Sequence, residues 1–352
     1  MTRFNLQSLL FALVLLILVL IGKSEGAHTV SSPVTNNIVS TSLIAEVQGS
    51  VAKDVLGEET IEISPAPALP PAALAKKPEP KIPPPVALNS SAFEPKIRFF
   101  SSLQPEPEKA FSSAPKISSR AALVKELTYE SLIFEKNLSQ RWPLASITKL
   151  MTALVALDRF KQDEKIVISE RAIQTEGQSG GFRAGEVFTA LDLIKALLVV
   201  SSNDAATALE EHIGVRNFLE LMRSYAFDLG LNQTTFTDSP GLSVLSQSTL
   251  VDLAKLSEYV FDTWPIIFEI STLKATTITE LVSRTTRVLK NNNKFAGSYD
   301  FIGGKTGYTE EAQGNLLSIF RHKDYLFLII VFGSADRFED TQNLYAWAKS
   351  NY

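Results

Sequence analysis

The distribution of proline decides which part of this 352-residue chain can fold into a domain. Of the 17 prolines, all but Pro143, Pro240 and Pro265 lie within residues 28–117. Such a composition favours extended polyproline chain, which buries too little apolar surface to offset its ordering entropy. We therefore interpret residues 28–117 as a disordered linker or stalk, and residues 118–352 as one large folded domain or two lobes.

Residues 1–27 have the pattern of a signal peptide or an N-terminal membrane anchor. Arg3 precedes an uncharged run from Phe4 to Gly22, and Lys23 ends the run. Its strongly apolar part is short for a membrane-spanning helix, but the whole run is just long enough. Because the small-residue cleavage site before Ala27 is poor, we favour a retained anchor that contacts the membrane. Either interpretation places the rest of the chain outside the cytoplasm, anchored to the membrane or secreted.

The composition argues against several classes of site. A net charge of −4 argues against nucleic acid as the main partner. The chain has no cysteine, which removes thiolate nucleophiles and zinc–cysteine sites. Its three histidines, His28, His212 and His322, are scattered, so we expect neither a Ser-His-Asp triad nor a His-rich metal site. An activity without metal or cofactor is the expectation.

Strand-like segments lie at both ends of residues 118–352, and helical periodicity lies between them. The expected strands are 121–124, 131–135, 301–304, 315–321 and 325–333. The expected helices begin near 146, 188, 204, 218, 249 and 338. This order predicts an α/β protein of the α+β type, in which an antiparallel sheet built from both ends is flanked by helices and interrupted by a helical lobe.

The sequence Ser-x-x-Lys occurs at Ser50, Ser113, Ser146 and Ser271, but only Ser146 opens a long apolar helix. Residues three apart share a helix face, so the Ser146 hydroxyl and the Lys149 amine can meet. A serine at the N-terminal end of a helix, with an amine one turn further on, suits a nucleophile and its base. An ordinary helix with a capping serine would explain the same pattern.

Two further motifs lie downstream. Ser201-Ser202-Asn203 stands in a tight link between two predicted helices, where a helix cap is the simpler explanation. Lys305-Thr306-Gly307 comes after a glycine-rich apolar run that suits a strand at a close backbone approach. By chance, a Lys-Thr-Gly sequence is expected in far fewer than about one in ten chains of this length.

Together and in this order, the three motifs resemble those of the D-alanyl-D-alanine carboxypeptidases, the low-molecular-weight penicillin-binding proteins related to class A β-lactamases. The resemblance covers about Ala121 to Trp347 and implies a β-lactamase/transpeptidase-like fold. Two positions depart from the family pattern, because Ser202 and Gln313 stand where the family usually has glycine.

The resemblance also implies roles for the motif residues. Ser146 is the nucleophile, Lys149 is its base, and Ser201 relays a proton to the leaving group. Substrate binding is assigned by resemblance to Asn203, Lys305, Thr306, Gly307, Tyr308 and Arg337. The implied substrate is a peptidoglycan stem peptide ending in D-Ala-D-Ala, β-lactam antibiotics are the implied covalent inhibitors, and no cofactor is needed.

Three other activities stay open on the sequence. A β-lactamase requires a glutamate-held deacylating water, and no Glu-x-x-x-Asn stands at a suitable place between Asn203 and Lys305. A peptidoglycan endopeptidase cuts cross-links in the same polymer. A non-enzymatic wall-binding module on a stalk needs no buried lysine base, so the intact Ser146, Lys149 and Lys305 argue against it.

Overall fold

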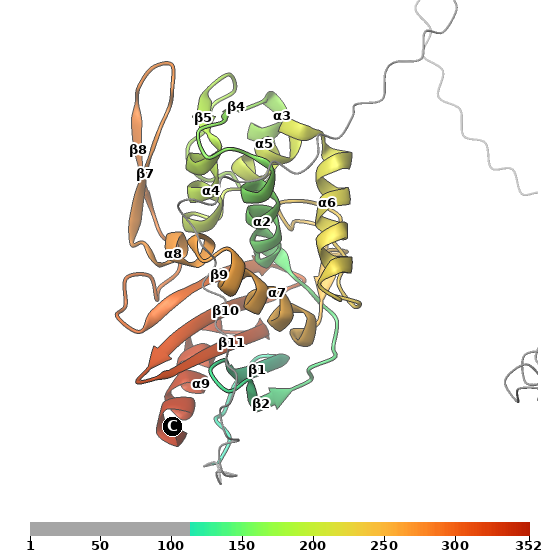
Figure 1. Ribbon diagram of the computed structural model, residues 1–352, viewed down its shortest axis with the longest axis vertical. Coiled ribbons are helices and arrows are strands. Elements are labelled where there is room, and N and C mark those ends of the chain that lie inside the picture. Colours follow the sequence, from blue (N-terminus) through green and yellow to red (C-terminus); the bar gives the residue numbers. More distant parts are fainter. Residues whose placement is uncertain (1–112) are drawn as a thin grey trace, which may run out of the picture. The chain divides into compact units, whose positions relative to one another are not determined.

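A five-stranded antiparallel sheet runs through the folded part of the chain, of which the computed structural model describes residues 113–352 (Figure 1). The strand order is β2-β1-β11-β10-β9. These strands are β1 Ala121–Glu126, β2 Ser131–Lys136, β9 Phe301–Thr309, β10 Gln313–His322 and β11 Tyr325–Ser334. Because β1 pairs with β11, with Ala121 opposite Phe332, the sheet joins both ends of the domain. The predicted fold class is confirmed.

Strand β11 lies in the middle of the sheet, and both of its faces are buried. Successive side chains of a strand point to opposite faces. One face packs under the helical lobe, and the other packs against the last helix, α9 Arg337–Asn351. The side chains on the two faces are, respectively, Leu328, Ile330 and Phe332, and Phe327, Ile329 and Val331. A strand buried on both sides explains the nearly unbroken apolar sequence here.

A helical lobe is inserted between β2 and β9 (Figure 1). Its helical segments are η1 Ala145–Thr148, α2 Lys149–Arg159, α3 Glu170–Ile173, α4 Ala190–Val199, α5 Asn203–Ile213, α6 Val215–Asp228, α7 Leu250–Thr263 and α8 Ile266–Thr272. Three short pairs of strands complete it: β3 Trp142–Pro143 with β6 Gln247–Ser248, β4 Lys165–Val167 with β5 Val187–Thr189, and β7 Ala275–Thr279 with β8 Thr286–Lys290. Helices α7 and α8 contact the sheet and connect the lobe to it.

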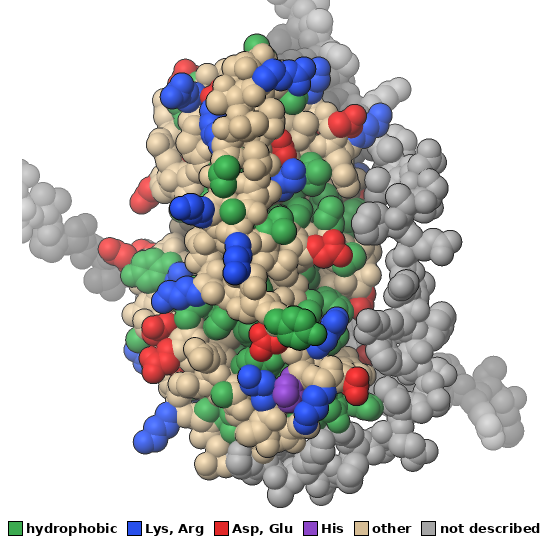
Figure 2. All heavy atoms as spheres, turned by 90° about the vertical axis from the view of Figure 1, so that its left-hand side faces the viewer, with side chains coloured by type: hydrophobic (Ala, Val, Ile, Leu, Met, Phe, Trp, Pro, Cys, Tyr) green, Lys and Arg blue, Asp and Glu red, His purple; other side chains and the backbone are tan. Residues whose placement is uncertain are grey.

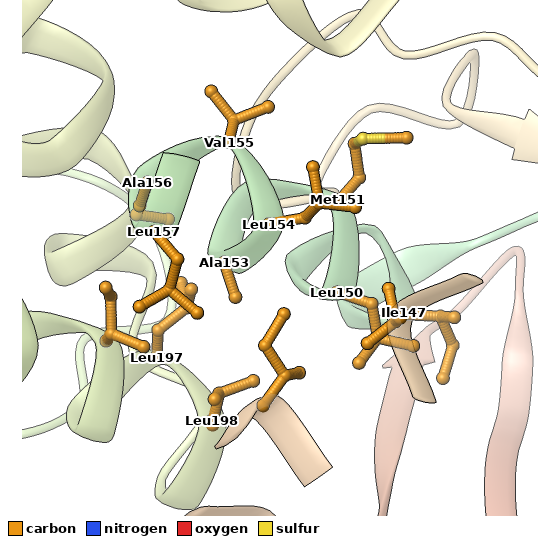
Figure 3. Close-up of a cluster of buried hydrophobic side chains, with 14 of the residues drawn as sticks. Ile147, Leu150, Met151, Ala153, Leu154, Val155, Ala156, Leu157, Leu197 and Leu198 are labelled. Atoms are coloured by element: carbon orange, nitrogen blue, oxygen red, sulfur yellow. The ribbon is translucent and has the colours of Figure 1, made fainter. Parts of the chain in front are cut away.

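Helix α2 is the centre of this lobe. Every residue from Lys149 to Leu157 is buried, and Figure 3 shows its apolar side chains pointing outward on several sides, with Leu197 and Leu198 of α4 nearby. Burying an apolar side chain stabilises a fold by roughly 1.5–3 kcal/mol. A helix enclosed in this way places the residues at its first turn with little freedom.

Several element boundaries differ from those predicted. The helix expected to begin near Ser146 begins at Lys149, because Ala145 to Thr148 form a 3₁₀ turn. The helix expected from residue 188 begins at Ala190, since Val187–Thr189 pair with β4. The β7–β8 hairpin was not predicted, because its threonine-rich sequence lacks a clear apolar alternation.

The start of the folded domain is fastened to α9 by Asp340. Its buried carboxylate accepts hydrogen bonds from the backbone N–H of Ser118 at 2.8 Å and of Ser119 at 2.8 Å. The hydroxyls of Ser118 and Ser334 donate to it as well, at 2.9 and 2.6 Å. The first residues of the domain are thereby held against its last helix.

Replacing Asp340 by alanine is expected to lower the free energy of unfolding by about 3 kcal/mol or more, because four donors lose a charged acceptor. Urea denaturation would measure the change. Asp336→Ala is the control, since that exposed carboxylate only caps α9 at Phe338 and Glu339 and should cost about 1 kcal/mol. Equal losses in the two variants would contradict this account of Asp340.

The predicted signal or anchor and most of the predicted stalk lie outside the described residues. Within residues 113–352, none of the helices has the length and apolar character needed to cross a membrane. On the side shown in Figure 2, basic, acidic and hydrophobic side chains are interspersed, with no large field of one charge.

Candidate active site

Ser146 lies in the η1 turn, which contacts β9. Ala145 enters this turn with a φ of +49°, a left-handed conformation that costs free energy in a non-glycine residue. The sheet holds the turn, because the Asn315 side-chain amide on β10 donates to the Leu144 carbonyl at 3.2 Å. Gly307 on β9 approaches so closely that an added Cβ would lie 2.9 Å from the same carbonyl oxygen. The turn that carries Ser146 is thus fixed against the edge of the sheet.

Lys149 begins α2, and its side chain is fully buried. Its Nζ lies 2.9 Å from Ser146 Oγ, 2.6 Å from Asn203 Oδ1 and 2.6 Å from the carbonyl oxygen of Pro240. These partners aim the amine at the hydroxyl. The structure thus places the Ser146 hydroxyl and the Lys149 amine in contact, as the Ser-x-x-Lys spacing predicts.

Burial lowers the pKa of Lys149 from 10.5 to about 7. The carboxylates of Asp238 and Asp204 act in the opposite direction and limit the shift. Asp204 is itself buried, and this raises its own pKa to about 6. Near neutral pH a large fraction of Lys149 is therefore the neutral amine, the form that can accept a proton from Ser146.

The segment around Pro240 encloses Lys149 from a side that the sequence motifs do not indicate. Pro240 supplies the carbonyl that accepts from the amine. Gly241 has a φ of +78°, and a Cβ there would lie 2.1 Å from the carbonyl oxygen of Ala145. Only glycine leaves room for this close contact with Ala145. The Pro240-Gly241 pair, which looks like an ordinary turn in the sequence, therefore lines the site.

The Ser201-Ser202-Asn203 motif forms the link between α4 and α5. Ser201 has a φ of +59°, and its hydroxyl accepts a hydrogen bond from Lys305 Nζ at 2.8 Å. Ser202 caps α5 and donates its hydroxyl to the Ser179 carbonyl at 2.6 Å. The helix-cap explanation therefore applies to Ser202, whereas the strained Ser201 is turned toward the lysine.

Both ends of the Asn203 side-chain amide are engaged. Its Oδ1 accepts from Lys149, and its Nδ2 donates to the Glu176 carbonyl at 2.7 Å. This arrangement makes Asn203 a support for the Lys149 amine. A substrate amide that binds Asn203 has to share or displace the Glu176 contact.

Lys305 brings a second buried amine to the site. Besides Ser201, its Nζ donates to the Thr306 carbonyl at 2.9 Å. Burial is the main cause that lowers the pKa of Lys305 well below its ordinary value, and the charges of Lys149 and Arg337 lower it further. An anion that binds here relieves this unfavourable environment, because a nearby negative charge favours the protonated amine.

Thr306 and Tyr308 on β9, and Arg337 at the start of α9, complete the predicted set. The Thr306 hydroxyl donates to Asn292 Oδ1 at 3.2 Å, and the Tyr308 side chain is 63% exposed. Arg337 Nη1 donates to the Gly307 carbonyl at 3.2 Å, whereas its buried Nε has no hydrogen-bond partner within the described part of the chain. A guanidinium with unused hydrogen-bonding capacity thus lies next to the Lys305-Thr306-Gly307 strand.

The other Ser-x-x-Lys sequences differ from the one at Ser146. The hydroxyl of Ser271 donates to the Phe268 carbonyl at 2.7 Å and accepts from the Gly304 backbone N–H at 2.9 Å, so it supports β9. Ser113 is exposed and lies before the first strand, and Ser50 falls outside the described residues.

Comparison with known proteins shows to which family the chain belongs. A sequence model of the D-alanyl-D-alanine carboxypeptidase family matches residues 108–336. The chain belongs to this family. It is therefore a serine-type D-alanyl-D-alanine carboxypeptidase by family, a peptidase and a hydrolase.

Relatives of this carboxypeptidase family member include two enzymes of Escherichia coli. The D-alanyl-D-alanine endopeptidase is 29% identical over 248 residues, which are 68% of this chain and 80% of that protein. D-alanyl-D-alanine carboxypeptidase DacC is 28% identical over 251 residues, 66% of this chain and 62% of that protein. Among solved structures, penicillin-binding protein D2 of Listeria monocytogenes in its cefotaxime-bound form matches with a TM-score of 0.60 and 26% identity, covering 67% of this chain and 99% of that one.

The two departures from the carboxypeptidase pattern fit their positions. Gln313, where the family usually has glycine, has a φ of +53°, the left-handed conformation that glycine adopts without strain. Ser202 has an ordinary φ of −60° and gains the contact with Ser179. Two supporting residues of the site, Asn315 and Asp238, were missed, because a single polar residue in an apolar strand or a turn carries no spacing signal.

Proposed function

We propose that this carboxypeptidase family member removes the terminal D-alanine from peptidoglycan stem peptides through an acyl-enzyme on Ser146. The observation that carries the proposal is the 2.9 Å contact between Lys149 Nζ and Ser146 Oγ, in a site that also holds the buried amine of Lys305. A serine beside a neutral amine is a nucleophile with its base. Cations next to it suit a substrate that ends in a carboxylate.

Each step of the reaction has a candidate residue. Ser146 Oγ attacks the carbonyl carbon of the penultimate D-alanine, and its proton passes to Lys149 Nζ. The backbone N–H groups of Ser146 and Tyr308 donate to the oxyanion. The peptide C–N bond breaks, and the proton held by Lys149 passes to the leaving nitrogen through Ser201, which Lys305 orients. Water then adds to the ester and gives a proton to the neutral Lys149, which returns it to Ser146 Oγ as the acyl C–O bond breaks.

The terminal carboxylate binds, in this proposal, between Lys305, Thr306 and Arg337. Support comes from the Lys305 amine, whose pKa is lowered by burial and by neighbouring cations and which an anion would stabilise. Gly307 leaves the strand without a side chain beside the η1 turn. Asn203 holds Lys149 in place and, on release from Glu176, can bind a substrate amide.

Arg337→Ala is expected to lower kcat/KM on peptides ending in free D-Ala-D-Ala by roughly 10- to 100-fold, because one charge-assisted contact is lost. On a substrate amidated at the C-terminus the loss should be small, since that substrate carries no charge there. Steady-state release of D-alanine, or of D-alanine amide, measures both.

A structural role of Arg337, through its bond to Gly307, predicts a different outcome. In that case both substrates would lose activity equally, and thermal stability would fall. Lys349→Ala, on the same helix, is the control for the loss of one positive charge on α9.

A second candidate activity is that of a peptidoglycan endopeptidase. The specific observation in its favour is the match across 80% of a relative that bears this name, against 62% of the carboxypeptidase DacC. The two activities use the same acyl-enzyme chemistry and differ in the leaving group beyond the scissile bond. That group is a single D-alanine with a free carboxylate in one case, and the rest of a second stem peptide in the other.

One experiment tests the proposed function against its rivals. Purified protein is incubated with stem pentapeptide, with cross-linked dimer and with penicillin. Release of D-alanine from the pentapeptide as the fastest reaction is the expected result, with penicillin forming a stable covalent adduct, as the cefotaxime-bound relative suggests. Faster cleavage of the dimer would favour the endopeptidase, rapid turnover of penicillin would favour a β-lactamase, and no cleavage would leave a wall-binding module.

We also infer that the enzyme works in the extracytoplasmic cell envelope. The uncharged run from Phe4 to Gly22 supports export or anchoring, and the proline-rich residues 28–117 support a stalk. Membrane fractionation of the full chain tests the anchor. A mature protein that begins near Ala27 and is found in the soluble fraction would contradict it.

A further inference from the structure

Three consecutive asparagines, Asn291, Asn292 and Asn293, begin the loop that connects β8 to β9 beside the active site. Two of them hold the loop together. The Asn291 side chain donates to the carbonyls of Ser271 and Leu273 at 2.9 and 2.8 Å and accepts from the Asn293 backbone N–H. Asn293 is buried, and its Oδ1 accepts from the backbone N–H of residue 295 at 3.0 Å. These two side chains help to hold the loop in its conformation.

Asn292 is different, because its side chain is exposed and directed at the site. Its backbone N–H donates to the Val199 carbonyl at 3.1 Å, just before the Ser201 link. Its Oδ1 accepts from the Thr306 hydroxyl at 3.2 Å. The residue therefore joins two of the motif segments, and within residues 113–352 the hydrogen bond of its side chain is the one with Thr306.

This contact occupies the single proton of the Thr306 hydroxyl. A hydroxyl donates one hydrogen bond and accepts others, and a carboxylate only accepts. While Thr306 donates to Asn292, it has no proton to offer a substrate carboxylate. A side-chain amide can resolve the conflict, since a half-turn replaces its oxygen by its NH₂ at the same place.

We propose that Asn292 is a positioning residue for the substrate carboxylate, acting by a half-turn of its amide. When the carboxylate arrives, Asn292 donates from Nδ2 to the Thr306 oxygen, and the Thr306 proton turns to the carboxylate. The inference rests on the proposed function, in which Thr306 binds that carboxylate. It adds a specificity-determining residue outside the three motifs.

Two substitutions at position 292 distinguish this role from a structural one. Asn292→Asp keeps an acceptor for Thr306 but has no NH₂, and an exposed aspartate is ionised at pH 7. It captures the Thr306 proton permanently, so kcat/KM on peptides ending in a free carboxylate should fall by roughly 10- to 100-fold, mainly through KM. Asn292→Ala leaves the Thr306 proton free, so its loss on the same peptides should be smaller, below about 10-fold. C-terminally amidated peptides should change by less than about 3-fold in both variants.

A structural role predicts the reverse order, because aspartate preserves the observed hydrogen bond and alanine removes it. An Ala variant that is more impaired than the Asp variant, or equal losses on acid and amide substrates, would overturn the proposal. The same substitution at Asn232, an exposed asparagine on the loop after α6, is the control for a general effect of added negative charge.

A double-mutant cycle tests whether the effect passes through Thr306. In a Thr306→Val background, Asn292→Asp should cost less than about 3-fold on acid substrates, because no proton remains to be captured. An undiminished loss would mean simple repulsion between the introduced carboxylate and the substrate, and the proposal would be wrong. The wild-type protein serves as the separate check. If the wild-type protein releases no D-alanine, the proposed function is wrong. If it releases D-alanine but the two variants do not show the predicted order of losses, only the proposed role of Asn292 is wrong.

Discussion

Replacing Ser146 by alanine is expected to abolish both D-alanine release and covalent labelling by a fluorescent penicillin, with a loss on the order of 10⁴-fold or more. The reason is chemical, because no acyl-enzyme forms without the hydroxyl that lies 2.9 Å from the Lys149 amine. Gel fluorescence after incubation with labelled penicillin measures acylation, and chromatography of the stem peptide measures hydrolysis.

The control for this substitution is Ser113→Ala, which removes the serine of another Ser-x-x-Lys sequence at an exposed position. It should retain full activity. Ser271→Ala is a poorer control, since the Ser271 hydroxyl supports β9 through the Gly304 N–H. Labelling that persists in Ser146→Ala would show that the nucleophile lies elsewhere.

The second large effect is expected from Lys149→Met, which should slow acylation by roughly 10²- to 10⁴-fold, the usual contribution of a general base. Methionine fills a similar buried space without an amine. In the wild-type enzyme the same residue sets the pH profile. With a pKa of about 7, Lys149 is protonated below that pH and cannot accept the serine proton. We therefore expect kcat/KM to fall about tenfold per pH unit below roughly pH 7 and to level off above it.

Lys149→Arg is the matched test of the neutral amine. Arginine is also a long basic side chain, but it stays protonated at all accessible pH values, so it should be as inactive as methionine. A rate that remains level from about pH 5 to 8, or substantial activity in Lys149→Arg, would show that Lys149 is not the base. Stopped-flow acylation by penicillin across this pH range provides the measurement.

The sequence was most informative where the spacing of a short motif brings particular chemical groups together. Ser146, Lys149, Ser201 and Lys305 are predicted by such spacings, and hydrogen bonds join them in two pairs. The division of the sheet between both ends of the domain was also predictable, because β11 is continuously apolar and the middle of the chain has helical periodicity.

The supporting contacts were not predictable, for physical reasons. Pro240 acts through its backbone carbonyl, which every residue type possesses. Asn315 acts only because the pairing of β10 brings it under the η1 turn. The positive φ of Ser201, in the link between α4 and α5, is a conformation that few residues other than glycine adopt. Such features depend on tertiary structure and produce no periodic pattern in the sequence.

The pairing of β1 with β11 also determines when the enzyme can become active. A chain that emerges in order from its N-terminus presents β1 about two hundred residues before its partner, so these contacts are distant in sequence and slow to form. Ser146 and Lys149 likewise emerge long before Lys305, and the η1 turn awaits the β9 and β10 residues that hold it. A partly synthesised chain therefore lacks a complete sheet, and we expect reactivity toward penicillin to begin only when nearly the whole domain has emerged.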